Sequence, residues 1–190
     1  MSKRLIVCLT GMPGAGKSTV ALFLNQKGFE VITMGDAVRE EAKRMGLEPT
    51  DVNLGKLMLK LRQDLGPGAI GHIVMQKLGR EGNFGNVVID GIRSIPEVEV
   101  LKNVGHVRLL AIHASQGTRF KHLRTRGRAD APANSNDFAG RDKRELSIGI
   151  SEAIALADET ISNNELTLEQ LKQHACAIVK VWLEEIEQNA

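Results

Sequence analysis

The residues with the clearest capacity for chemistry begin at Gly11. They match the phosphate-binding pattern G-x-x-x-x-G-K-[ST] in Gly11, Met12, Pro13, Gly14, Ala15, Gly16, Lys17 and Ser18. The glycines let the backbone wrap so that amide N–H groups point at an anion. Lys17 is expected to hold the β- and γ-phosphates of ATP, Ser18 to ligate Mg²⁺, and Thr19 to lie at the positive end of the following helix. We therefore predict a nucleotide site with ATP and Mg²⁺ as cofactors.

A second candidate position is acidic and follows an apolar stretch at residues 87–89. Asp90 ends this stretch and is followed by Gly91, Ile92 and Arg93. At the carboxyl end of a strand beside the phosphate loop, Asp90 would help to hold Mg²⁺. The alternative is a plain turn, because Asp-Gly is also a turn dipeptide. We favour the metal site because of the loop upstream.

A third position follows the predicted strand at residues 30–33. Asp36 and Arg39 follow this strand, so they could face the same crevice as the phosphate loop and Asp90, at the carboxyl ends of the strands. Asp36 could orient an acceptor hydroxyl or accept its proton, and Arg39 could hold an acceptor anion. Alternatively, both residues only begin a solvated helix, in which an acidic residue near the N-terminus is favourable in any case.

A basic segment spans residues 115–151. Its cations are Arg119, Lys121, Arg124, Arg126, Arg128, Arg141, Lys143 and Arg144. Arginines on a flap can stabilise the charge of a phosphoryl group in transfer, and we predict a lid that is mobile until donor and acceptor are bound. The run could instead be a solvated face or grip a nucleic-acid backbone. An aromatic content of 3% with no Tyr argues against a base-stacking platform.

The order of elements predicts how these groups are positioned. Apolar stretches typical of strands lie at residues 5–9, 30–33, 87–89, 107–112 and 159–161. They alternate with helical patterns, including a helical insert at residues 36–80 that is interrupted by Gly66-Pro67-Gly68 and is expected to bind the acceptor. A last helix begins at Thr167, which can form a capping box with Gln170. We predict an α/β fold: a five-stranded parallel sheet with helices on both faces.

Composition narrows the class of protein. A chain of 190 residues with 42% hydrophobic and 25% charged residues fits one compact domain. The net charge of +2 does not indicate a nucleic-acid or membrane partner. The early strand leaves no room for a signal peptide, so we expect a cytoplasmic protein, monomeric or homodimeric. Cys8 and Cys176 are expected to be free buried thiols, and Trp182 a core or dimer contact.

These motifs together resemble the nucleoside monophosphate kinases, adenylate kinase above all. In that family the second strand leads into Gly-Asp-x-x-Arg, here Gly35 to Arg39, which contacts the acceptor nucleotide. The third strand leads into Asp-Gly-Phe-Pro-Arg, whose arginine binds the acceptor phosphate. Here that motif is one residue shorter, with Ile92 in place of Phe-Pro. The resemblance implies that Asp36, Arg39 and Arg93 face the acceptor.

Other segments extend the resemblance. Residues 157–164 are similar to the end of dephospho-coenzyme A kinase, which implies that Asn163 lies near the donor adenine. The resemblance also implies that Arg126 faces the donor phosphates and that Arg141 and Arg144 close over the transferring group. The lid would be short and helical, without a four-cysteine zinc set. Nearly the whole chain resembles an archaeal family of adenylate-kinase-like proteins, which implies the fold and no substrate.

The sequence thus predicts a single P-loop kinase domain over residues 1–190. We expect it to transfer the γ-phosphoryl group of Mg-ATP to a small acceptor, a nucleoside monophosphate. One alternative is a kinase like that of dephospho-coenzyme A, in which Asp36 acts as a base toward a hydroxyl group. Another is a regulatory ATPase or RNA-associated switch, in which the basic segment contacts a partner and water is the only acceptor.

Overall fold

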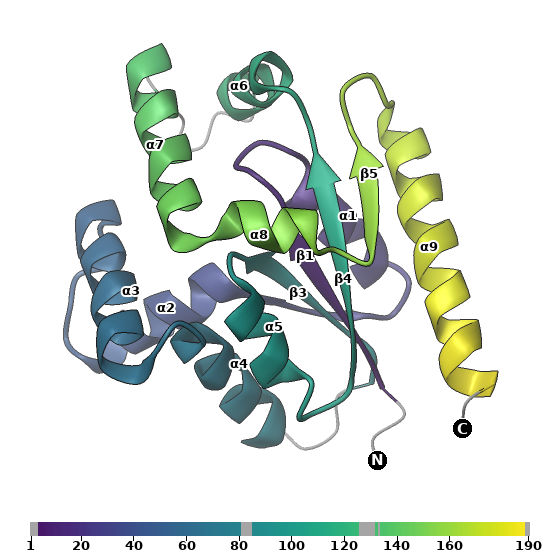
Figure 1. Ribbon diagram of the computed structural model, residues 1–190, viewed down its shortest axis with the longest axis horizontal. Coiled ribbons are helices and arrows are strands. Elements are labelled where there is room, and N and C mark those ends of the chain that lie inside the picture. The colour runs from purple at the N-terminus through teal and green to yellow at the C-terminus, as the bar shows by residue number, and fades with distance from the viewer. Residues whose placement is uncertain (1–3, 81–84, 126–131, 133, 189–190) are drawn as a thin grey trace.

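The sheet of the molecule is parallel throughout. The computed structural model describes residues 4–80, 85–125, 132 and 134–188. Within these ranges five strands pair in the order β2-β3-β1-β4-β5 (Figure 1). They are β1 (Leu5–Thr10), β2 (Glu30–Thr33), β3 (Val87–Ile92), β4 (His106–His113) and β5 (Glu159–Ser162). The five predicted strands are confirmed, and four are longer than predicted by one to three residues. Strands β1, β3 and β5 extend at their carboxyl ends, and β4 extends by one residue at each end.

Helices connect the strands and cover both faces of the sheet. In the described part of the chain they are α1 (Lys17–Asn25), α2 (Met34–Arg44), α3 (Asp51–Leu65), α4 (Ala69–Arg80), α5 (Ile95–Leu101), α6 (Gln116–Thr125), α7 (Ser135–Ile148), α8 (Ile150–Ala155) and α9 (Leu168–Gln188). The predicted α/β fold is confirmed. Helix α1 begins two residues before the expected Thr19, because Gly16 adopts φ 115° and caps it.

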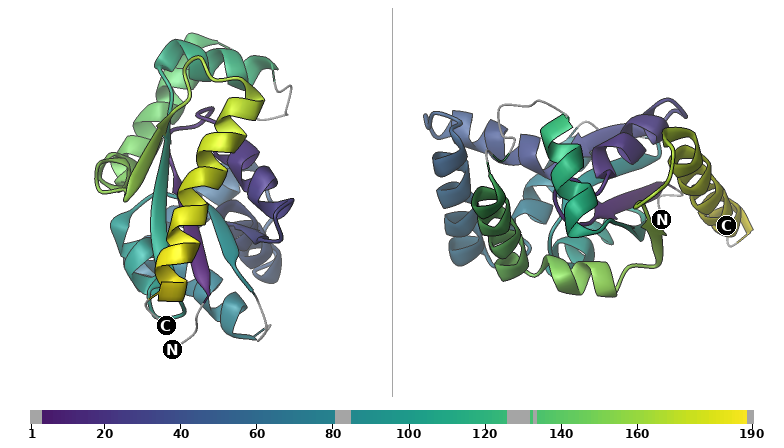
Figure 2. Two further views of the ribbon diagram at one scale, coloured as in Figure 1. Left: turned by 90° about the vertical axis from the view of Figure 1, so that its right-hand side faces the viewer. Right: turned by 90° about the horizontal axis from the view of Figure 1, so that it is seen from above.

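Strand β1 is the centre of the core. Leu5, Val7 and Leu9 pack with α1 and α9 on one face of the sheet. Ile6 and Cys8 pack on the other face, among apolar residues of α2 to α5. The two layers of helices are visible from above in Figure 2. Because both faces of β1 are completely buried, the loop that follows it starts from a fixed point.

The final helix begins as the sequence predicts. The Thr167 amide donates to Gln170 Oε1 at 2.9 Å, and the Gln170 amide donates to Thr167 Oγ1 at 3.2 Å. This reciprocal pair satisfies two amides that the helix itself leaves unpaired. The helix carries Trp182, which is buried in the core with Leu171 and Val179, as expected.

The helical insert stacks beside the sheet. Helices α2, α3 and α4 contact one another, and α4 also packs on α5. Gly66, at φ 87°, ends α3 at the predicted break. None of the described helices is long and apolar enough to cross a membrane.

The two thiols differ from each other. Cys8 is fully buried and free, as expected, and burial raises the pKa of its thiol. Cys176 is free but only partly buried, so the expectation of a buried thiol is wrong there. It lies on α9 one residue after the buried Ala175, at a position turned partly out of the core.

Candidate active site

A cleft of about 1090 Å³ opens at the carboxyl ends of the strands. Its lining comes from the phosphate loop, α1, α2, the end of β3, α6, α7 and the start of α9. Helices α3 and α4 pack behind α2 and α5 rather than on this lining. Open parallel sheets bind ligands at this edge. The cleft therefore gathers most of the residues that the sequence predicted to act together.

Three glycines let the phosphate loop lie against three separate elements. A Cβ atom on Gly11 would lie 2.1 Å from the Ile112 carbonyl oxygen of β4. A Cβ on Gly14 would lie 2.6 Å from the carbonyl oxygen of Arg119 in α6, and one on Gly16 equally close to the Asn163 amide. All three glycines also have positive φ, so any other residue would be strained as well as obstructed.

The outer side of the loop is held by donors from distant parts of the chain. The carbonyl oxygen of Pro13 accepts from Arg119 at 3.1 Å, and that of Ala15 accepts from Asn163 Nδ2 at 2.8 Å. The Gly14 carbonyl lies 3.0 Å from His122 Nδ1, which must carry the proton in this contact. In a trans peptide the C=O and N–H bonds point in opposite directions. Fixing these carbonyls therefore fixes the direction of the amides that follow them.

Lys17 occupies the middle of the loop. Its Nζ donates to the carbonyl oxygens of Gly11 at 2.6 Å and Met12 at 3.3 Å. Burial lowers the pKa of Lys17 to about 8, and the nearby Asp90 carboxylate opposes this lowering. The ammonium group is thus held by its own loop in a poorly hydrated place, where a phosphate would be a stronger partner.

Ser18 and Asp90 form the expected pair across the loop. The Ser18 hydroxyl donates to Asp90 Oδ2 at 2.9 Å, and Asp90 Oδ1 is buried without a hydrogen-bond partner among the described residues. A buried, unpartnered carboxylate oxygen is costly unless a ligand or water satisfies it. Carboxylate and hydroxyl oxygens are the hard donors that Mg²⁺ prefers, directly or through water. These two side chains therefore fit a Mg²⁺ ion, which would neutralise charge on bound phosphates.

Asp36 and Arg39 line the opposite part of the cleft. Thr33 caps α2 by accepting from the Asp36 amide at 2.9 Å, and its hydroxyl donates to the Asp36 carboxylate. Arg39 Nε donates to Asp36 Oδ1 at 3.0 Å. Partial burial raises the pKa of Asp36, but the Thr33 and Arg39 contacts outweigh it and leave the pKa below its usual value. Both side chains are about half exposed, 53% for Asp36 and 51% for Arg39.

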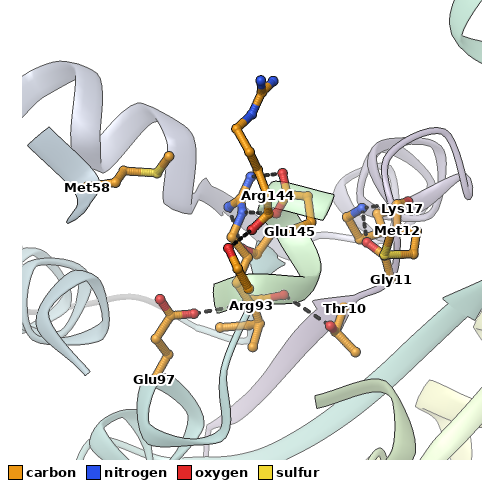
Figure 3. Close-up of polar contacts among 12 residues, drawn as sticks. Thr10, Gly11, Met12, Lys17, Met58, Arg93, Glu97, Arg144 and Glu145 are labelled. Atoms are coloured by element: carbon orange, nitrogen blue, oxygen red, sulfur yellow. Dashed lines mark hydrogen bonds and ion pairs between the residues drawn. The ribbon is translucent and has the colours of Figure 1, made fainter. Parts of the chain in front are cut away.

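Arg93 lies between these two parts, and its partner was missed at the level of sequence. Its Nε donates to Glu145 Oε2 at 2.7 Å and its Nη1 to the Gly91 carbonyl at 2.9 Å (Figure 3). Burial raises the pKa of Glu145. The charge and hydrogen bonds of Arg93, together with a smaller effect of the Lys17 charge, outweigh burial and lower the pKa. The one signal in the sequence is that Glu145 follows Arg141 by four residues, which places both on one helix face.

A second carboxylate that sequence reasoning missed fixes the backbone at Arg93. Glu97 is fully buried and accepts from the Arg93 amide at 2.8 Å (Figure 3). Its other oxygen accepts from Arg62 of α3 at 2.6 Å. The helical insert is thereby tied to the chain that carries Arg93. Glu97 follows Arg93 by four positions across a helix start, and this short spacing was the available clue.

The basic segment divides into anchored and exposed parts. Arg119 was grouped with the hydrated lid cations, which is wrong: it is buried and pairs with Asp142 at 2.7 Å, joining α6 to α7. Arg141 lines the cleft. Arg144 is exposed, and its side chain extends away from the Arg93–Glu145 pair (Figure 3). Arg126 lies outside the described residues. The structure thus brings Arg141, but not Arg144, to the cleft.

Comparisons with known proteins agree with this geometry. The AAA domain family matches residues 10–137. A UPF0200 protein of Pyrococcus abyssi is 42% identical over 165 residues, which cover 85% of this chain and 88% of that protein. The structure of TT1252 from Thermus thermophilus superposes with a TM-score of 0.63 at 18% identity, covering 93% of this chain and 97% of that one. Shikimate kinase from Acinetobacter baumannii, in complex with shikimate, gives 0.58 at 18% identity, with 96% and 94% covered. At these identities the two structures show the P-loop kinase fold alone.

Proposed function

This chain belongs to the UPF0200 family and to the AAA domain family, and on that premise we propose that it is a phosphotransferase using Mg-ATP. The acceptor that we propose is a small anion, a nucleoside monophosphate. One observation carries the proposal: a single cleft is lined by Lys17 of the phosphate loop and also by two cations from other elements, Arg39 of α2 and Arg93 after β3. A hydrolase needs only the first site, whereas a kinase for an anionic acceptor needs both.

The donor side is assigned to ATP. Lys17 and the loop amides hold its phosphates, and Ser18 with Asp90 holds Mg²⁺, which would supply charge neutralisation on the phosphate oxygens. Arg141 lines the same cleft and is placed to stabilise the phosphoryl group in transfer. Asn163 supports this side by holding the Ala15 carbonyl.

The state of Asp36 supports an anionic acceptor over a neutral hydroxyl. A phosphate acceptor is already ionised and needs no base, whereas a hydroxyl acceptor benefits from one. A general base works best when its pKa lies near the working pH. The pKa of Asp36 is lowered, and its carboxylate is already engaged by Thr33 and Arg39. We assign Asp36 to orienting Arg39 and the acceptor rather than to removing a proton.

A transfer assay tests the proposal. Purified protein is incubated with Mg²⁺ and ATP labelled at the γ-phosphate, together with nucleoside monophosphates, dephospho-coenzyme A, shikimate or RNA in separate reactions. We expect labelled nucleoside diphosphate with at least one monophosphate. Lys17→Ala protein is the matched control, because contaminating kinases would survive that substitution.

Two other results would reject the proposal in distinct ways. Label transferred only to dephospho-coenzyme A or another hydroxyl compound would restore Asp36 as a base. Release of free phosphate alone, accelerated by RNA, would identify a regulatory ATPase. Each result names the class of acceptor that replaces the monophosphate.

A further inference from the structure

We propose that Glu145 is a positioning residue that occupies the acceptor's anion position on Arg93 and yields it when a phosphate-bearing acceptor binds. The inference rests on the proposed function, because it takes Arg93 as the contact for that anion. It adds a role for α7: this helix senses whether the acceptor is present.

The contact geometry is that of an oxyanion on an arginine. Glu145 Oε2 lies 2.7 Å from Arg93 Nε, and Oε1 lies 3.4 Å from Nη2, so two oxygens face one edge of the guanidinium. A phosphate uses the same edge for paired hydrogen bonds. The remaining nitrogen, Nη1, donates to the Gly91 carbonyl. Three of the five guanidinium N–H groups thus have protein acceptors, and Glu145 fills the Nε edge that a phosphate would use.

Glu145 is the acceptor that can leave. The Gly91 carbonyl is part of the strand β3 backbone, whereas Glu145 is a side chain on a separate helix. Arg93 itself cannot easily withdraw, because its amide is bonded to the buried Glu97. A phosphate dianion also carries more charge than a carboxylate, and the two repel each other beside the same cations. A phosphate that binds through the Nε edge therefore displaces Glu145.

Release of Glu145 would free only part of α7. Three residues earlier, Asp142 is bonded to Arg119 through both of its oxygens, at 2.9 and 2.7 Å, in a buried pair. The other end of α7 meets α8 at Gly149, whose φ is 109°. The turn between these two points carries Glu145. We infer that the acceptor moves this turn while Asp142 keeps the helix on the phosphate loop.

Binding of inorganic phosphate tests the proposal without turnover, with the phosphate loop kept occupied by a saturating non-hydrolysable ATP analogue. Titration calorimetry is performed on the wild-type protein, on Glu145→Gln, and on Glu152→Gln, an exposed glutamate in the first turn of α8. We expect Glu145→Gln to bind phosphate about tenfold more tightly, because the competing carboxylate is gone. Glu152→Gln should match the wild type. Glu145→Asp keeps the charge on a shorter side chain, so its affinity for phosphate should lie between those of the wild type and Glu145→Gln.

A purely structural role for Glu145 predicts the opposite sign. If Glu145 only orients Arg93 toward its ligand, Glu145→Gln will bind phosphate more weakly, and the proposal is overturned. Unchanged affinity overturns it equally. The proposed function is judged separately by label transfer. Tighter phosphate binding to Glu145→Gln without any label transfer would reject the proposed kinase activity but support the displacement of Glu145 by phosphate.

A measurement on unaltered protein covers the case in which Glu145→Gln does not fold. The Arg93 Nε–H resonance in a nitrogen-15 spectrum is identified by its absence from Arg93→Lys protein. We expect adenosine monophosphate to shift this resonance and adenosine to leave it in place, because only the anion replaces Glu145. A resonance that stays in place with the monophosphate, or moves equally with adenosine, would overturn the proposal.

Discussion

The proposed donor and acceptor sides of the cleft are held by different kinds of contact. On the donor side, glycines that tolerate no side chain press the phosphate loop against β4, α6 and Asn163. On the acceptor side, the cations are held by carboxylates: Arg39 by Asp36 and Arg93 by Glu145. Backbone contacts of the first kind fix one geometry, whereas side-chain ion pairs can exchange partners. Under the proposed function, this difference would give a rigid site for ATP and an adjustable site for the acceptor.

Helix α7 contacts both sides of the cleft, and within one turn it carries one ion pair that is buried and one that lines the cleft. Its Asp142 pairs with Arg119, and these side chains are 13% and 7% exposed. Its Glu145 pairs with Arg93, where exposure is 12% and 23%. The first pair also reaches the Pro13 carbonyl of the loop, whereas the second lines the open cleft. One helix therefore carries a fixed contact and an exchangeable contact three residues apart.

The largest effect should come from the rigid side. Lys17→Ala removes the charge that neutralises phosphates in the transition state, and we expect kcat to fall by about 10³-fold. The fold should persist, because among the described residues the Lys17 ammonium donates to carbonyls of its own loop. Label transfer and circular dichroism are measured together. Folded protein with an undiminished rate would remove the phosphate loop from the chemistry.

The fixed contact of α7 should matter more for stability than an exposed pair. Asp142→Asn leaves the buried Arg119 without its counter-charge, and we expect a loss of about 3 kcal/mol. For a chain of this size that lowers the melting temperature by roughly 6–12 °C. Glu99→Gln, which breaks the exposed pair with Lys102, is the control and should change stability by less than about 0.5 kcal/mol. Equal melting temperatures would show that α7 is not anchored there.

The adjustable side should respond in binding more than in rate. Asp36→Asn releases Arg39 and removes a carboxylate that lines the acceptor part of the cleft. We expect the acceptor KM to rise by about tenfold, with kcat reduced by no more than that factor. Steady-state kinetics with varied acceptor at saturating ATP separate the two constants. A fall of 10²–10⁴ in kcat at constant KM would instead identify Asp36 as a base.

The smallest effect concerns pH on the donor side. The pKa of Lys17 is about 8 in the ligand-free protein, and bound phosphates must raise it. Below pH 8 the lysine is already protonated. Above pH 8, binding requires proton uptake, so ATP affinity should fall by up to about tenfold per pH unit. Calorimetry at pH 9 in two buffers of different ionisation heat measures the uptake, which should disappear in Lys17→Ala.

The rigid side is also the side that sequence could predict. The loop pattern is contiguous, and its glycines, Lys17 and Ser18 have one well-known geometry, so Asp90 could be placed by its strand. The strands were visible because both faces of a parallel sheet are apolar. Their ends were underestimated, because polar residues such as Thr10 and Asp90 continue the ladder past the apolar run.

The adjustable side could not be predicted in the same way. The pairing of Arg93 with Glu145 spans 52 positions and depends on how α7 turns toward the cleft. In the sequence Arg119 cannot be told apart from its basic neighbours. Its burial depends on pairing with Asp142, which lies 23 positions further along the chain. The assignments of Asp36, Arg39, Arg93 and Arg141 to substrate remain predictions, as does the closing of residues 115–151 as a lid.

The central position of β1 has a consequence for how the protein is made. Ile6 pairs with Val87 on one side and Val107 on the other, so β1 gains both of its neighbours only after about 80 and 100 further residues have been synthesised. The phosphate loop that extends from β1 is therefore complete only when the sheet is. Under the proposed function, nucleotide would then bind only molecules with a complete sheet, and at one hundred times its Kd it would stabilise them by about 2.7 kcal/mol. Removal of nucleotide would lower the stability of the folded protein by the same amount.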